Sequence, residues 1–193
     1  MRTCRLFIKR CFDILASFLA IVCLLPLWLL LALLVKADVH ESIFFRQMRT
    51  GKDGKPFMIL KFRTMRSDTR AEEAYDMSKD DERVTRFGSW MRRVKLDEAP
   101  QLVNILFGDM SFVGPRPYIA GQNAGLSKKR FAMRPGLTGL AQVNGNCALS
   151  WEERLAYDLD YVDHFTLMLD VRILLRTVKV VCRGEEKCVR HHR

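Results

Sequence analysis

The sequence predicts a mainly helical α+β protein with an N-terminal membrane helix, a small β-hairpin and amphipathic helices that lie at the membrane interface. Three observations predict this fold: an apolar run from Ala16 to Val35, two strand-like segments around a turn-rich loop, and later segments with helical apolar spacing. The chain of 193 residues is long enough for one compact domain beside the membrane element. We expect an anchor over residues 1–36, a cytosolic domain over residues 37–182 and a charged tail over residues 183–193.

The apolar run has the length that a helix needs to cross a bilayer, and only Ser17 in it is clearly polar. Two features complicate a straight span. Pro26 falls near the middle and removes a helical hydrogen bond. Basic residues flank both ends, and positive residues favour the cytoplasmic side. The residues alone therefore leave two alternatives open: a kinked spanning helix, or a re-entrant helix whose two ends lie on the same side.

The hairpin is predicted from segments 42–47 and 57–62, which flank the turn-rich loop 50–56. Segment 67–83 is polar and is expected to form a solvated helix or loop. Segment 84–94 is expected to be a helix with Phe87, Trp90, Met91 and Val94 on one face. Segment 167–182 is expected to be a second amphipathic helix, with Ile173, Leu174 and Val178 opposite its basic residues. The apolar faces of both helices either pack in the core or lie at the membrane interface.

The composition limits the partners of the chain. The formal net charge is +10 and the sequence pI is about 9.6, which favours a polyanion such as a phosphorylated substrate, anionic lipid or nucleic acid. The strong apolar segment argues against nucleic acid as the partner. None of the six cysteines forms a C-x-x-C pair, so the sequence carries no zinc or redox signature.

The segment from Leu96 to Pro117 carries the richest chemistry. Asp97 and Glu98 precede Pro100 and an apolar helical pattern, so we expect them at a helix N-terminus, with Asp97 as a cap. Adjacent carboxylates there serve either simple capping or a magnesium-assisted phosphoryl site. Nearby arginines favour the phosphoryl site, since Arg92 lies upstream and prolines flank Arg116 rigidly. Arg134 precedes Pro135 in a similar way. Three acidic residues further on, Asp158, Asp160 and Asp163, are expected on a solvated face.

Several motifs in the right order identify a family. They are Lys9–Asp13 (KRCFD), Leu60–Met65 (LKFRTM), Leu96–Leu102 (LDEAPQL), Gly108–Pro117 (GDMSFVGPRP) and Arg134–Gly145 (RPGLTGLAQVNG). Through these motifs the chain resembles the monotopic phosphoglycosyl transferases of the bacterial sugar transferase family. The resemblance covers about residues 9–181.

The resemblance implies a reaction, a site and a location. Asp97 would attack the β-phosphate of a UDP-sugar, release UMP and carry the phosphosugar until polyprenol (undecaprenyl) phosphate accepts it. Glu98 would bind Mg²⁺, and Lys61, Arg92, Arg116 and Asp170 match positions in or near the family's active site. The anchor would be a re-entrant helix broken at proline, held in the inner-membrane lipid on its cytoplasmic face. The sugar, the glycoconjugate pathway and the oligomeric state are left open.

Two positions depart from the family pattern. Leu25 stands where many members have serine before the anchor proline, and Asn146 stands where many have arginine after Gly145. The first departure bears on the detailed bend of the anchor and the second on the choice of donor. Two rival functions remain: an anchored hydrolase of nucleotide diphosphate-sugars, and a non-enzymatic scaffold that binds anionic lipid through its net charge.

Overall fold

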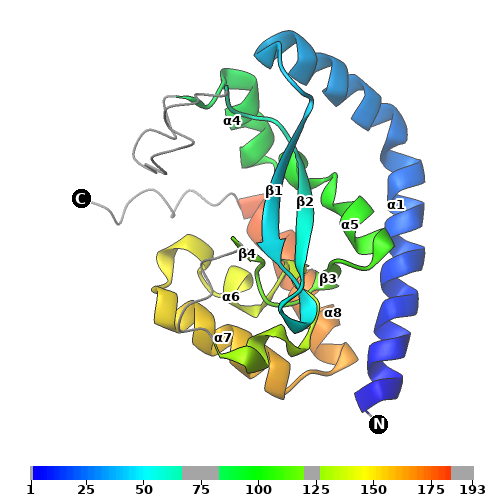
Figure 1. Cartoon of the computed structure of the whole chain (residues 1–193), viewed down its shortest axis with the longest axis vertical. Coiled ribbons are helices and arrows are strands. Elements are labelled where there is room, and N and C mark those ends of the chain that lie inside the picture. The colour runs from blue at the N-terminus through cyan, green and yellow to red at the C-terminus, as the bar shows by residue number, and fades with distance from the viewer. Residues whose placement is uncertain (1, 67–82, 120–126, 184–193) are drawn as a thin grey trace.

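A computed structural model describes residues 2–66, 83–119 and 127–183 of the chain. One long helix lies along one side of a body that contains two small sheets and several shorter helices (Figure 1). The helices are α1 (Arg2–Val39), α4 (Arg86–Arg93), α5 (Gln101–Phe107), α6 (Leu140–Val143), α7 (Trp151–Asp163) and α8 (Leu167–Arg183). The strands are β1 (Phe44–Thr50), β2 (Pro56–Phe62), β3 (Ser111–Val113), β4 (Tyr118–Ile119) and β5 (Gly136–Thr138), and 3₁₀ turns occupy Lys52–Gly54, Leu96–Glu98, Lys128–Ala132 and Asn146–Ala148.

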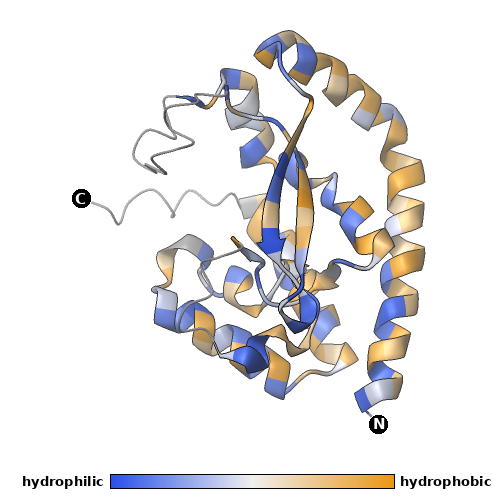
Figure 2. Ribbon diagram, in the orientation of Figure 1, coloured by the Kyte–Doolittle hydropathy of each residue, from blue (hydrophilic) through white to orange (hydrophobic). Residues whose placement is uncertain are grey.

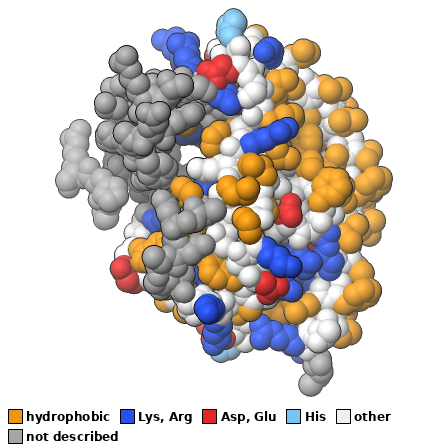
Figure 3. Space-filling view, viewed as in Figure 1, with side chains coloured by type: hydrophobic (Ala, Val, Ile, Leu, Met, Phe, Trp, Pro, Cys, Tyr) orange, Lys and Arg blue, Asp and Glu red, His pale blue; other side chains and the backbone are white. Residues whose placement is uncertain are grey.

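Helix α1 contains the predicted apolar run and extends beyond both ends of it. Among the described residues it is the one helix that is long and apolar enough to cross a membrane. It follows a curved path with Pro26 inside it, and its C-terminal end turns toward α4 (Figure 1). Its outer side is strongly apolar (Figure 2), and hydrophobic side chains gather along that side of the surface (Figure 3). A mainly helical α+β fold with a long apolar N-terminal helix is thereby confirmed.

The inner side of α1 contacts the rest of the protein near both ends of the helix. Toward its N-terminus, three buried polar residues one turn apart, Lys9, Asp13 and Ser17, face inward. Lys9 Nζ lies 2.6 Å from Asp170 Oδ2 of α8, and Asp13 Oδ1 accepts a hydrogen bond from the Phe112 backbone at 3.1 Å. Toward its C-terminus the same side is apolar, and it packs against β2 and α4 through Leu31, Val35, Val39, Phe62 and Met91.

The predicted hairpin is confirmed. β1 and β2 pair antiparallel from Phe44 opposite Phe62 to Thr50 opposite Pro56. The turn between them places Asp53 at a φ of 56° and Gly54 at 76°, a conformation for which an Asp-Gly pair is suited. β4 adds a third strand beside β1, while β3 and β5 form a separate parallel pair.

The hairpin and α5 form the layer that carries the site. Phe57 and Ile59 of β2 pack on Leu102 and Ile105 of α5 in a buried cluster that also touches the middle of α1. Asn104 ties the two elements together, since its side chain accepts from Leu60 N at 3.0 Å and donates to Met58 O at 2.8 Å. These hydrogen bonds fix the position of α5 along β2.

The predicted apolar faces of α4 and α8 are buried only in part. In α4, Met91 is fully buried, but Trp90 is exposed and stacks on Phe87 at 5.6 Å between ring centroids. In α8, Ile173 is buried whereas Val178 is exposed. Five positions correspond to a rotation of about 140° around a helix, so Ile173 and Val178 lie on different faces. The solvated segment expected at 67–83 lies outside the described residues except for Arg83, and the charged tail lies outside them except for Arg183.

Candidate active site

Asp97 and Glu98 lie in the 3₁₀ turn between α4 and α5, one turn before α5 begins. Lys95 adopts a left-handed conformation with a φ of 60°, which turns the chain sharply after α4. Pro100, not Asp97, occupies the N-cap position of α5. The expectation of Asp97 as a helix cap is therefore wrong, because the 3₁₀ turn and Pro100 separate it from the helix. Its carboxylate is left available for other partners.

Basic groups from three other segments reach this turn. Lys61 of β2 places its Nζ 2.6 Å from Glu98 Oε1. Arg92 of α4 donates from Nε to Thr64 Oγ1 at 2.8 Å, and a Cβ added to Gly88 would lie 2.2 Å from the Thr64 carbonyl oxygen. Glycine at position 88 thus allows α4 to approach the end of β2 closely. Residues 61, 92, 97 and 98 are brought into one cluster.

Arg116 approaches the cluster from the loop between β3 and β4. Its Nη1 donates to Asn146 Oδ1 at 2.8 Å, and its positive charge acts on Glu98. Asn146, one of the two departures from the family pattern, is thus a direct neighbour of a predicted site arginine. A side chain at this position affects how the Arg116 guanidinium is presented.

The two carboxylates differ in their pKa. Burial raises the pKa of Asp97 and the charge of Glu98 raises it further, against the opposing effect of Lys61 and Arg92. Burial also acts to raise the pKa of Glu98, but Lys61, with Arg116 and Lys95, outweighs it and holds that pKa below its ordinary value. Glu98 is therefore the firmly ionised member of the pair. The carboxylate of Asp97 is the more basic of the two, which suits a group that donates an electron pair to form a bond.

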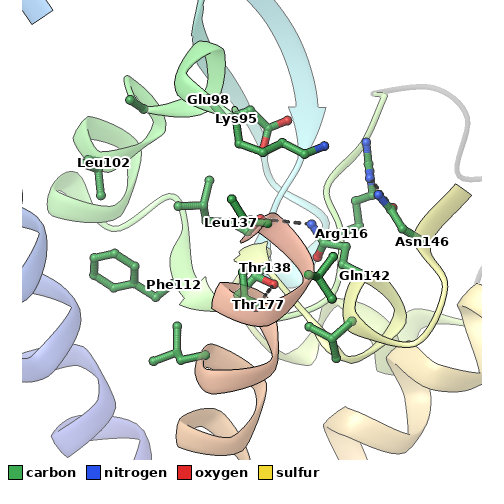
Figure 4. Close-up of a pocket in the computed structure, with 15 residues that line it drawn as sticks. Lys95, Glu98, Leu102, Phe112, Arg116, Leu137, Thr138, Gln142, Asn146 and Thr177 are labelled. Atoms are coloured by element: carbon green, nitrogen blue, oxygen red, sulfur yellow. Dashed lines mark hydrogen bonds between the residues drawn. The ribbon is translucent and has the colours of Figure 1, made fainter. Parts of the chain in front are cut away.

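A cavity of about 280 Å³ lies beside the turn (Figure 4). Lys95, Glu98, Arg116 and Asn146 line one end of it, and apolar side chains from α5, β3, β5 and α8 line much of the remainder. Asp97 is next to this cavity but does not line it, and Asp97 is only 8% exposed. Its Oδ1 atom is buried without a hydrogen-bond partner. An unpaired buried carboxylate oxygen is costly unless a cation or substrate contacts it.

The residues of this turn fit Mg²⁺. Within the described residues no group of three His, Cys, Asp or Glu side chains could enclose a metal. Mg²⁺ is commonly held by one or two carboxylates together with water and substrate phosphates, however, and needs no full protein cage. The carboxylate of Glu98 supplies one such ligand, and the adjacent Asp97 carboxylate, with its unpaired Oδ1, adds negative charge that a divalent cation would offset.

Arg134 and Asp170 do not join the cluster. Arg134 donates from Nε to the carbonyl oxygen of Gly108 at 2.7 Å, at the far end of α5. Asp170 is buried with Lys9 and accepts from Tyr161 Oη at 2.7 Å. In these positions Arg134 hydrogen-bonds the backbone at the C-terminal end of α5, and Asp170 pairs with Lys9 of α1. Neither side chain lines the cavity beside Glu98.

A buried ion pair supports the Arg116 loop from behind. Arg130 and Asp158 are almost fully buried, and Arg130 Nη2 lies 2.6 Å from Asp158 Oδ2. Arg130 also donates to the backbone carbonyl of Arg116 and lies over the ring of Tyr118. Asp158 is therefore not on the solvated face where the sequence placed it, because Arg130, which is distant in sequence, neutralises it. Asp163 does lie in an exposed ion pair with Lys129, and Asp160 is exposed, with its Oδ1 2.8 Å from His164 Nδ1.

Comparison with known proteins yields one family. A profile described as bacterial sugar transferase matches residues 4–184. The chain is 39% identical over 181 residues to an uncharacterized sugar transferase EpsL of Bacillus subtilis, covering 92% of this chain and 89% of the relative. It is 41% identical over 188 residues to an exopolysaccharide production protein PSS of Rhizobium leguminosarum, covering 90% and 94%. It is 41% identical over 181 residues to a UDP-glucose:undecaprenyl-phosphate glucose-1-phosphate transferase of Caulobacter vibrioides, covering 88% and 68%.

Proposed function

The chain belongs to the bacterial sugar transferase family and is a transferase, and from that premise we propose that it moves a phosphosugar from a UDP-sugar to polyprenol phosphate. The relative from Caulobacter vibrioides is named for UDP-glucose and undecaprenyl phosphate, and the relative from Rhizobium leguminosarum for exopolysaccharide production. The reaction would be the first membrane step in the synthesis of a glycoconjugate. UDP-glucose is the first donor to test.

The observation that carries this proposal is the buried, unpaired carboxylate oxygen of Asp97 beside the Lys61–Glu98 ion pair. A free carboxylate with a raised pKa is a suitable nucleophile, and the surrounding cations are suitable partners for a diphosphate. The cavity of about 280 Å³ is just below the range of about 300–1,000 Å³ for ligand sites. That size favours one substrate at a time and hence two successive displacements.

In the first displacement, an oxygen of Asp97 attacks the β-phosphorus of the UDP-sugar. The bond from that phosphorus to the bridging oxygen breaks, and UMP leaves with the electron pair. In the second displacement, a phosphate oxygen of polyprenol phosphate attacks the same phosphorus, and the Asp97–phosphorus bond breaks. Asp97 regains its carboxylate, and the product is a polyprenyl diphosphate sugar.

The remaining residues bind and orient. Lys61 holds Glu98 at 2.6 Å, and Arg92 and Arg116 offer planar groups suited to phosphate oxygens. Mg²⁺, held by Glu98, would offset the charge of the diphosphate against the two carboxylates and leave the unpaired oxygen of Asp97 available as the nucleophile.

The test is UMP release by the full chain in detergent, measured with a panel of UDP-sugars, with and without undecaprenyl phosphate. We expect UMP and a lipid-linked phosphosugar to form in equal amounts with at least one donor. Excess chelator should abolish both, since two phosphates cannot approach the paired carboxylates without a divalent cation.

Each rival function gives a different result in this assay. Steady UMP and sugar 1-phosphate production without undecaprenyl phosphate would identify a hydrolase. The absence of UMP with every donor would support a lipid-binding scaffold and overturn the proposal. Full activity in excess chelator would refute the magnesium requirement.

We further propose that α1 is re-entrant and that the chain lies on the cytoplasmic face of the inner membrane. Both ends of α1 are tied to one body, through Lys9 with Asp170 and through Val35 and Val39 with β2 and α4. A straight crossing of a hydrocarbon core about 30 Å thick would separate one of those ends from the body. Basic residues on both flanks favour the same side as well.

A labelling experiment tests this topology. Cysteine is introduced at position 2 (Arg2→Cys) in a chain without other cysteines, and a membrane-impermeant thiol reagent is added to intact spheroplasts. Asp53→Cys, in the exposed hairpin turn, serves as the cytoplasmic reference. Both positions should react only after permeabilisation. Reaction at position 2 alone in intact spheroplasts would show a spanning helix.

A further inference from the structure

The cavity beside Glu98 has two chemically different parts. Lys95, Glu98 and Arg116 line its charged end. Beyond them the cavity has an apolar wall, to which α5, β3, β5 and α8 all contribute (Figure 4). The apolar wall consists of Leu102, Phe112, Leu137, Leu174, Val180 and Val181.

The hydroxyl groups along the cavity are already satisfied by the protein. Thr138 and Thr177 hydrogen-bond to each other at 2.7 Å, and Thr177 also donates to the carbonyl oxygen of Ile173 at 2.8 Å. The amide nitrogen of Gln142 donates to the carbonyl oxygen of Leu137 at 3.0 Å, whereas its Oε1 is buried without a hydrogen-bond partner. Apart from that single acceptor, a polar ligand in this part of the cavity would exchange its hydrogen bonds with water for apolar contacts, which is unfavourable.

The apolar wall continues to the apolar surface of the molecule. Phe112 lies with its ring centroid 6.0 Å from that of Phe12 of α1, and Phe12 is 53% exposed. Val181, which also lines the cavity, is 38% exposed. Apolar side chains thus lead from the charged end of the cavity to the side of the molecule where α1 presents its hydrophobic residues (Figure 3).

On the basis of the proposed function, we propose that the apolar wall binds the isoprene units next to the phosphate of polyprenol phosphate. Of the two substrates, only this acceptor joins a phosphate directly to a hydrocarbon chain; the donor carries polar uridine and sugar groups on both sides of its phosphates. The phosphate would lie at Lys95 and Arg116, beside Asp97. A cavity of about 280 Å³ is small, so it would take only the first units, and the rest of the chain would run along α1 into the lipid.

The test compares Val181→Asn, in the apolar wall, with Val178→Asn, the same change on the same helix. Val178 is 63% exposed and does not line the cavity. The KM values for undecaprenyl phosphate, for the three-unit farnesyl phosphate and for the UDP-sugar are measured in detergent. We expect Val181→Asn to raise both acceptor KM values about tenfold relative to the donor KM, because an apolar contact is lost. Val178→Asn should leave the ratio as in the unmodified chain.

Leu137→Ala tests the apolar wall a second time, from β5, and should raise the same ratio. An unchanged ratio in both wall variants would overturn the proposal. So would an increase seen with undecaprenyl phosphate but not with farnesyl phosphate, or an equal increase for donor and acceptor. One further measurement separates failure of the proposed function from failure of the apolar-wall proposal. Without acceptor, the unmodified chain should release UMP once, in a burst. Absence of this burst would count against the proposed function, whereas its presence leaves the apolar wall to be judged on the acceptor KM.

Discussion

Replacing Asp97 with asparagine is expected to lower the turnover number for UMP release by roughly three to five orders of magnitude, as for loss of a covalent nucleophile. Asparagine preserves the size of the side chain and removes its negative charge and its nucleophilic oxygen. The neighbouring carboxylate of Glu98 cannot readily take over this role, because it is engaged by Lys61 at 2.6 Å. Steady-state UMP release and mass spectrometry of the quenched enzyme measure the effect.

Asp53→Asn, in the exposed hairpin turn, is the matched control and should keep full activity. The unmodified enzyme, quenched without acceptor, should carry one phosphosugar on Asp97. Because the pKa of Asp97 is raised, its reactive anion is lost at a higher pH than for an ordinary aspartate, and activity should fall as pH decreases through that range. Near-native turnover in Asp97→Asn, or a phosphosugar trapped on another residue, would show that the assignment is wrong.

Replacing Asp158 with asparagine should destabilise the fold by about 3 kcal/mol or more, because it leaves the buried guanidinium of Arg130 without its counter-charge. For a chain of this size that corresponds to a decrease in melting temperature of about 10 °C. The Arg116 loop should suffer as well, since Arg130 donates to the Arg116 backbone. Thermal unfolding in detergent, followed by circular dichroism, measures the change.

Asp160→Asn provides the control on the same helix. Asp160 is exposed and pairs only with His164 at the surface, so its substitution should change the free energy of unfolding by less than about 0.5 kcal/mol. The double variant Arg130→Met with Asp158→Leu should recover much of the lost stability, since apolar residues often replace a buried ion pair without cost. A melting temperature for Asp158→Asn equal to that of Asp160→Asn would contradict the structural role of the pair.

Local elements of this protein were predictable because each depends on residues close in sequence. A continuous apolar run predicted α1, and the turn-rich loop that contains Asp53 and Gly54 predicted the hairpin. The family motifs likewise singled out Asp97 and Glu98 before any contact was known. Apolar periodicity gave the extent of α8 but not which of its apolar residues are buried, since Ile173 is buried and Val178 is exposed.

Contacts between distant residues were decided only by the tertiary structure. Lys61 and Glu98 are 37 positions apart and meet because β2 packs beside the start of α5. In the sequence, Lys9 was one of the basic residues that flank the apolar run. Its spacing of four residues from Asp13 and eight from Ser17 was nevertheless a signal for one buried helical face. Arg130 neutralises Asp158, and Arg134 turns to Gly108 instead of the cavity.

The family, the long apolar helix, the hairpin and the pair of candidate catalytic carboxylates could be predicted from the sequence. The tertiary structure alone decided which cations face those carboxylates, which acidic side chains are buried structural partners, and that a charged site opens onto an apolar wall. The two kinds of feature depend on interactions over different separations in the sequence. Turns and helices follow from interactions over a few residues, whereas the environment of a charged side chain depends on segments that only folding brings together.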